Sequence, residues 1–268
     1  RFRLRARPLE EASFAPDGAL IGTLIHELLQ RVWQNLKDSE TLAQHDATAL
    51  QAKVGPLAVA TLDDIGRRRP DLFTARFRAL EAARLTRLII DWLEIERERT
   101  QPFSVQALEQ DQTIELGGLR LSTRADRVDR LADGSLAVID YKTGRLVSNE
   151  GWFDERLTEP QLPLYCLQSG GEVNTALLAR VRGDRPGCVF VGLSATDDFA
   201  PGVETPKNQR EETDWPGLLA QWQQTLGDLA EEIRHGRSDA TPSEQACRYC
   251  ALGALCRVQE MIQEDNGA

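Results

Sequence analysis

A short stretch near the middle of the chain combines the residue types needed for metal-assisted hydrolysis. It reads Thr123-Arg-Ala-Asp126-Arg-Val-Asp129-Arg, then a turn, then Val138-Ile-Asp140-Tyr-Lys142-Thr-Gly144. Because side chains alternate along a strand, Asp140 and Lys142 share a face. A three-residue loop over 132–134 places Asp126 directly opposite Asp140 in an antiparallel pair. Two facing carboxylates repel each other, so we expect a divalent cation to neutralise them.

The expected chemistry of this hairpin is phosphodiester hydrolysis. Oxygen ligands favour Mg²⁺ or Mn²⁺ over Zn²⁺. Such a cation polarises a phosphate and acidifies a bound water, and the Lys142 ammonium stabilises the charge that develops beside it. Taken alone, the hairpin fits a solvated surface ion pair better than an active site. Asp129 is the weaker ligand candidate because it falls on the opposite strand face, and Asp133 is typical of a turn.

Two helical segments carry further candidate residues. His26 follows Gly22 along the edge of an apolar helical stripe, where it is either a ligand turned inward or a satisfied core histidine. Gln161 and Tyr165 lie one turn apart on a helix face. They could reach the hairpin or the substrate strand, although packing of Tyr165 on the sheet explains its ring equally well.

The elements that position these residues follow from hydrophobic periodicity. A helix is predicted over 19–37, shorter helices over 41–69 with a break at Gly55-Pro56, and a long helix over 72–99. Glycine-containing turns separate three antiparallel strands. These strands and the later elements are predicted as strands 103–116, 119–131 and 135–142, a helix over 158–169, strands 173–182 and 188–195, an exposed loop over 197–214 and a helix over 215–235. Helices followed by a sheet and mixed elements predict an α/β sandwich around a mixed sheet.

The Asp126–Asp140–Lys142 hairpin resembles the active-site hairpin of the RecB-type branch of the PD-(D/E)XK nuclease superfamily. Gly22-Thr-Leu-Ile-His26 resembles the helical Gly-x-x-x-His motif of that branch, and Gln161-Leu-Pro-Leu-Tyr165 resembles its Gln-x-x-x-Tyr motif. The resemblance implies a restriction-endonuclease-like core, a mixed central β-sheet flanked by helices. It implies that His26, Asp126 and Asp140 ligate Mg²⁺ or Mn²⁺, that Lys142 positions and activates water, and that Gln161 and Tyr165 complete the catalytic site.

The function implied by this resemblance is a metal-dependent DNA nuclease, an exonuclease acting on single strands or DNA ends in recombinational repair beside a helicase domain or subunit. Two alternatives stay open. One is a catalytically silent nuclease-like domain that binds DNA or serves as a scaffold. The other is a zinc-ribbon-like binding protein built on the C-terminal cysteines, for which a fourth ligand is missing.

Cys247, Cys250 and Cys256 form a Cys-x2-Cys-x5-Cys run near the C-terminal end. Resemblance to the AddB-type subgroup implies that they hold a [4Fe–4S] cluster in the full-length protein. The fourth ligand would precede Arg1, so the cluster is expected to be absent or incomplete in this sequence. Cys166 and Cys188 occur in apolar segments and are predicted to be small buried hydrophobes.

Length and composition frame these expectations. The chain has 268 residues, of which 41% are hydrophobic and 28% charged, and it lacks an apolar run long enough for a membrane helix or a signal peptide. We predict a cytoplasmic nuclease domain over 1–240, with a helical part over 1–100 and a catalytic sheet core over 101–196, followed by a cysteine-rich tail over 241–268. The absence of an initial Met predicts a C-terminal fragment of a longer protein. The net charge of −10 counts against DNA binding in general, although a binding channel is a local feature.

Overall fold

In the sequence, a group of helices comes before the first strand of the sheet. The computed structural model describes residues 16–70, 72–168 and 172–237, together with Cys247, Cys250 and Cys256. The helices are α1 (Gly18–Leu36), α2 (Ser39–Ala43), α3 (Ala47–Gly66) and α4 (Ala75–Arg97). Each begins after an aspartate or threonine whose side chain accepts a hydrogen bond from a first-turn backbone N–H, which satisfies an otherwise unpaired donor. The predicted helix over 19–37 is confirmed to within one residue.

Helix α3 runs through Gly55-Pro56 without interruption, so the predicted break there is wrong. A proline inside a helix costs about 3 kcal/mol because it removes a hydrogen bond and crowds the preceding turn. One face of α3 buries a full apolar stripe in the core shared with α1 and α4, made by Leu50, Val54, Ala58, Leu62 and Ile65. Burial of several such side chains, at about 1.5–3 kcal/mol for each large one, outweighs that cost.

The sheet has six strands among the described residues, in the spatial order of the sequence. They are β1 (Phe103–Leu116), β2 (Leu119–Leu131), β3 (Leu136–Lys142), β4 (Val173–Arg180), β5 (Val189–Ser194) and β6 (Val203–Glu204). The pairs β1–β2, β2–β3 and β4–β5 are antiparallel, whereas β3–β4 and β5–β6 are parallel. The first three strands match the predicted boundaries to within one residue. The stretch 197–214 is not only a loop, because it contains β6 and α6 (Pro206–Gln209).

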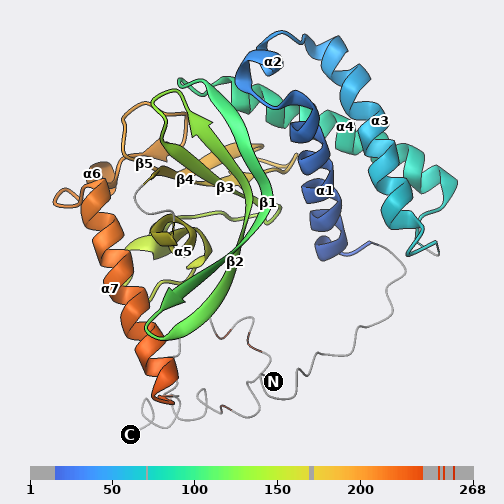
Figure 1. Cartoon of the computed structure of the whole chain (residues 1–268). Helices are drawn as coiled ribbons and strands as arrows, with labels where there is room; N and C mark the ends of the chain where they lie inside the picture. The colour runs from blue at the N-terminus through green and yellow to red at the C-terminus, as the bar shows by residue number, and fades with distance from the viewer. Residues whose placement is uncertain are drawn as a thin grey trace, which may run out of the picture.

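Helices cover both faces of this mixed sheet (Figure 1). Helices α1–α4 lie on one side, where Trp33, Trp92 and Phe190 belong to one apolar core. A short 3-10 helix η1 (Glu150–Phe153), α5 (Gln161–Gln168) and α7 (Trp215–Arg234) lie on the other, where Trp152 and Trp222 anchor a second core. The predicted α/β fold, a restriction-endonuclease-like mixed sheet between helices, is confirmed. In the part of the chain described here, no helix is both long and apolar enough to cross a bilayer.

A buried ionic network joins the end of α4 to β2. Arg127, fully buried, donates to Asp129 at 2.7 Å from Nε and to Glu96 at 2.6 Å from Nη1. Arg99 donates to the same Asp129 at 2.6 Å. The Arg127 guanidinium also lies 3.8 Å from the ring centroid of Trp33. Two cations and two anions compensate each other, so Asp129 serves the core and faces away from the candidate ligands, as its strand position predicted.

Candidate active site

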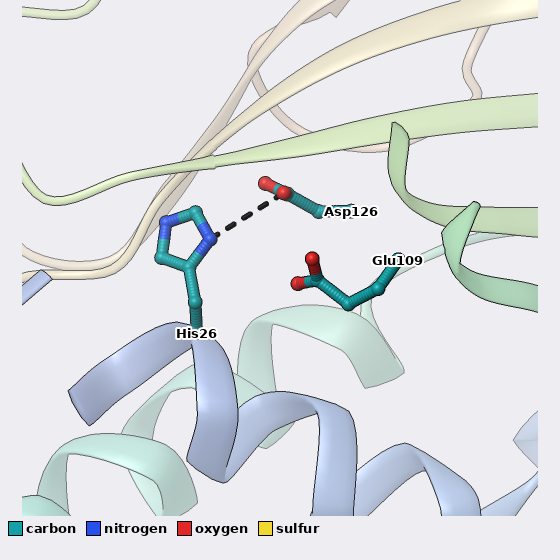
Figure 2. A group of neighbouring side chains, drawn as sticks. All are labelled: His26, Glu109 and Asp126. Atoms are coloured by element: carbon teal, nitrogen blue, oxygen red, sulfur yellow. Dashed lines mark ion pairs between the residues drawn. The ribbon is translucent and has the colours of Figure 1, made fainter. Parts of the chain in front are cut away.

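Helix α1 presents His26 to β2, where its Nδ1 lies 3.4 Å from Oδ1 of Asp126 (Figure 2). The close approach of this helix depends on Gly22, one turn earlier. A Cβ on Gly22 would lie 3.2 Å from Oγ1 of Thr143, just beyond the end of β3, so a side chain there would crowd the Thr143 hydroxyl. The His26 ring also packs edge-on against Tyr141, with centroids 5.9 Å apart.

Asp126 is a buried residue of β2 whose second oxygen is held by the neighbouring strand. The backbone N–H of Tyr141 donates to Oδ2 of Asp126 at 2.7 Å. Strand β2 pairs with β3 at Arg127–Ile139 and Val128–Val138. The same register, continued by one residue, aligns Asp126 with Asp140. Leu131 N–H donates to the Ser135 carbonyl at 2.8 Å and closes the loop over 132–134. Both the loop and the strand register predicted from the sequence are therefore confirmed.

Asp140 and Lys142 form an ion pair at the end of β3. Nζ of Lys142 lies 2.8 Å from Oδ2 of Asp140 and 3.5 Å from Oε2 of Glu159. Burial and the charge of Asp126 raise the pKa of Asp140 despite the attraction of Lys142. Burial lowers the pKa of Lys142, but Asp140 and Glu159 outweigh it and raise the pKa overall, so the ammonium keeps its charge.

Glu109 on β1 completes a group that the sequence analysis missed. One ligand atom each of His26, Glu109 and Asp126 lie within 4.8 Å of one another (Figure 2). Glu109 has a φ of +50° and stands opposite Asp126 between the pairs Leu108–Arg127 and Gln110–Ala125. The Gly117-Gly118 turn sets this register, so counting back from it would have revealed the position. Burial and the charge of Asp126 raise the pKa of Glu109, while Arg124, with Nε 2.8 Å from a Glu109 oxygen, lowers it.

Negative charge also acts on His26. Burial lowers the pKa of the imidazole, but the Asp126 carboxylate, with Asp140 and Glu109 beyond it, outweighs burial and raises the pKa overall. One imidazole nitrogen from α1 and carboxylate oxygens from β1 and β2 converge, and this set of donors suits a hard divalent cation. The residues present therefore fit Mg²⁺ or Mn²⁺, with His26, Glu109 and Asp126 as the closest group and Asp140 beside it.

Clefts adjoin this centre on two sides. One of about 560 Å³ is lined by His26, Glu109 and Thr143, with Arg31 and Arg124 as its cations. Another of about 380 Å³ is lined by Lys142, Glu159 and the segment that follows β3. The two clefts share no lining residue, and each borders a different part of the centre.

Gln161 and Tyr165 of α5 contact the hairpin strands. Gln161 donates to the backbone carbonyl of Arg124 at 2.8 Å. The Tyr165 hydroxyl donates to Gln110 at 2.9 Å and accepts from Gln112 at 2.8 Å, both on β1. Burial raises the pKa of Tyr165 to about 12, so the phenol stays protonated and is no general base. These contacts support a positioning role for the two side chains predicted to be catalytic.

The cysteines fall into two sets. Cys166 is buried and Cys188 half-buried, and burial raises the pKa of both thiols. Most of the tail over 241–268 lies outside the described residues. Within it, the Cys250 N–H donates to the Cys247 carbonyl at 3.2 Å, and Cys256 is exposed. The iron–sulfur ligation of these three residues stays a prediction.

Comparison with known proteins now places this site in a family. The sequence pattern of the PD-(D/E)XK nuclease superfamily matches residues 1–257. The chain belongs to this superfamily. The two facing aspartates and the lysine of the hairpin, Asp126, Asp140 and Lys142, lie within the matched residues of this PD-(D/E)XK protein. No curated protein matches the chain. A solved structure titled "Crystal structure of SSO0001" is similar over 92% of this chain and 88% of its own, with 15% identity and a TM-score of 0.30, too weak a likeness to support an argument.

Proposed function

We propose that the protein is a Mg²⁺- or Mn²⁺-dependent DNA nuclease that hydrolyses phosphodiester bonds. Membership of a nuclease superfamily supports this proposal. The observation that carries it is the convergence of His26, Asp126 and Glu109 within 4.8 Å, next to the Asp140–Lys142 pair at 2.8 Å. In this proposal Lys142 acts on the substrate and does not merely balance Asp140.

Each residue has a role that its position supports. His26, Asp126, Asp140 and Glu109 would hold the cation, which when bound polarises the scissile phosphate and acidifies water. Tyr141 orients Asp126 through its backbone N–H, leaving Oδ1 to face His26. Lys142 donates a hydrogen bond to the attacking water or to a phosphate oxygen, where an ammonium stabilises charge that builds up in the transition state. Asp140 and Glu159 hold that ammonium at the correct side of the site.

The finer assignment is a RecB-type exonuclease that acts on single strands or DNA ends in recombinational repair. The three sequence motifs between Gly22 and Tyr165, the two helical ones and the hairpin, support it. A chain with net charge −10 attracts DNA poorly by itself, so we propose that a helicase domain or subunit delivers the strand. We further propose that Cys247, Cys250 and Cys256 provide three ligands of a [4Fe–4S] cluster in the longer protein. Iron and acid-labile sulfide analysis of that longer protein tests the cluster, and their absence would refute it.

The nuclease proposal is tested with end-labelled linear DNA and covalently closed circular DNA in the presence of Mn²⁺. The wild-type protein should shorten linear strands from their ends and spare the circle. Asp126→Asn and Lys142→Met should each be slower by about 100-fold or more. Lys53→Met, which replaces an exposed lysine of α3, is the matched control and should retain full activity. Binding of DNA without metal-dependent cleavage by the wild type would instead support the scaffold alternative.

A further inference from the structure

Leu146 is the most exposed of the large apolar side chains in the described ranges, with 93% of its surface open to solvent. Leu80 and Ile233, the next most exposed at 65%, lie on the helices α4 and α7. Isolated apolar residues on a protein surface are common, so exposure alone assigns no role. The place of Leu146 in the fold distinguishes it.

Leu146 stands four residues after Lys142, in the segment between β3 and η1. It lines the same 380 Å³ cleft as Lys142 and Glu159. An apolar side chain here borders the path of any strand whose phosphate reaches Lys142.

The backbone that carries Leu146 is held in place from β4 and the residues after it. Nε of the buried Arg180 donates to the Arg145 carbonyl at 3.1 Å, and Arg182 donates to the Thr143 carbonyl at 3.0 Å. The loop is therefore anchored on both sides of Gly144. These two hydrogen bonds hold the backbone just before Leu146. A side chain on a backbone that is already held loses less conformational entropy when it contacts another molecule.

Charge indicates which part of a nucleotide this cleft accepts. The 380 Å³ cleft is lined by three carboxylates, those of Glu150, Asp154 and Glu159, and by the ammonium of Lys142. Away from Lys142 these carboxylates repel phosphate, whereas a neutral base can pack on an aliphatic side chain and donate its amino hydrogens to them. The other cleft is lined by two arginines, Arg31 and Arg124, and by two glutamates, Glu27 and Glu109, so its charges balance and it repels a sugar–phosphate backbone less.

We propose that Leu146 packs against the nucleobase next to the scissile phosphodiester and so selects DNA whose bases are unstacked at that point. This inference rests on the proposed nuclease function and names the side chain that would give it a preference for single strands or frayed ends. In an intact duplex the base faces are covered by their neighbours, and an apolar side chain reaches them only where the stack opens.

The test pairs a change in the protein with a change in the DNA. Single-stranded oligonucleotides carry one abasic residue at successive positions from the end, and kcat/KM is measured for each bond with Mn²⁺. For the wild type, removal of the contacted base should lower kcat/KM about three- to tenfold, the loss expected for a partly buried leucine contact. Leu146→Ala should show a similar loss with all bases present and little further loss with the abasic strand. Leu146→Met should restore most of the base dependence.

Leu80→Ala, a change of an exposed leucine far along the sequence from the site, is the matched control and should behave like the wild type. If Leu146→Ala remains as sensitive to the abasic residue as the wild type, the contact does not exist and the inference is overturned. The absence of all metal-dependent cleavage by the wild type would instead overturn the proposed function, so the two failures are distinguishable.

Discussion

The backbone N–H of Tyr141 donates a 2.7 Å hydrogen bond to Oδ2 of Asp126, beyond the point where the β2–β3 ladder ends at Arg127–Ile139. A side chain thus takes the place of the next backbone pair. The bond keeps Asp126 aligned with Asp140 and leaves Oδ1 directed at His26. The main chain therefore fixes the spacing of the acidic strands before any cation binds, and such preorganisation is what a catalytic metal site requires.

Clustered carboxylates should destabilise the metal-free protein. Because burial and the charge of Asp126 raise the pKa of Asp140, its ionised form is less favourable in the fold than in the unfolded chain. We expect Asp140→Asn to raise the metal-free midpoint of thermal unfolding by about 2–4 °C, equivalent to about 1 kcal/mol, and to lose the further rise that Mn²⁺ gives the wild type. Differential scanning calorimetry with and without Mn²⁺ measures both. An equal response of wild type and variant to Mn²⁺ would exclude Asp140 from the cation site.

Glu109 should contribute to cation affinity even though it lies outside the sequence motifs. Its carboxylate belongs to the group within 4.8 Å that includes His26 and Asp126. We expect Glu109→Gln to weaken Mn²⁺ binding about 10- to 100-fold, measured by isothermal titration calorimetry. Asp111→Asn is the control, because Asp111 is an exposed carboxylate that also lies near Arg124, at 3.8 Å from its Nε. Equal affinities for the two variants would show that Glu109 only pairs with Arg124.

Gly22 should matter for activity and not for stability. A methyl group there meets Oγ1 of Thr143 at 3.2 Å, so either the Thr143 side chain or α1 must yield by a few tenths of an ångström, and we expect a shift of α1 that lengthens the contact between His26 and Asp126. Replacing a helical glycine by alanine also favours the helix by about 0.5–1 kcal/mol, which offsets the crowding. We expect an unchanged unfolding midpoint with a clear loss of nuclease activity.

The double variant Gly22→Ala/Thr143→Ala provides the control for this steric explanation. Removal of Oγ1 gives the new methyl group room, so activity should recover relative to Gly22→Ala. If Thr143→Ala and Gly22→Ala reduce activity independently of each other, crowding at this contact is not the cause.

The sequence predicted the catalytic hairpin well because its turns are specified locally. Gly117-Gly118 and the loop over 132–134 set the registers of β1, β2 and β3, and both glycine positions in the first turn have positive φ. Local pattern also predicted α1 and α7. The registers and helices named above are determined by residues that are neighbours in the sequence, and tertiary contacts do not change them.

Features that depend on distant partners were missed. The break predicted at Gly55-Pro56 is absent because α3 packs along its whole length against α1 and α4. Glu109 is a different case: the local turn at Gly117-Gly118 already places it opposite Asp126, but no motif around it marks it as a ligand. The partners of Arg127 come from α4 and β2 together, a combination that no local pattern reveals.

Arg127 should contribute strongly to the stability of the fold and be dispensable for cation binding. It is fully buried between Glu96 and Asp129, so Arg127→Met would leave these two buried carboxylates with Arg99 as the remaining cation of the network. Breaking a buried ion pair on one side costs about 3–5 kcal/mol, and Arg127→Lys should also be costly because an ammonium cannot reproduce the forked contacts of a guanidinium. Urea unfolding measures these losses.

Arg120→Met is the control, since Arg120 pairs with Glu115 at a surface where both side chains are 77% exposed. The free energy of unfolding of this control variant should change by less than about 0.5 kcal/mol. At low temperature, where Arg127→Met remains folded, its affinity for Mn²⁺ should equal that of the wild type. A stable Arg127→Met protein that has lost cation binding would reverse this assignment and make Arg127 part of the active site.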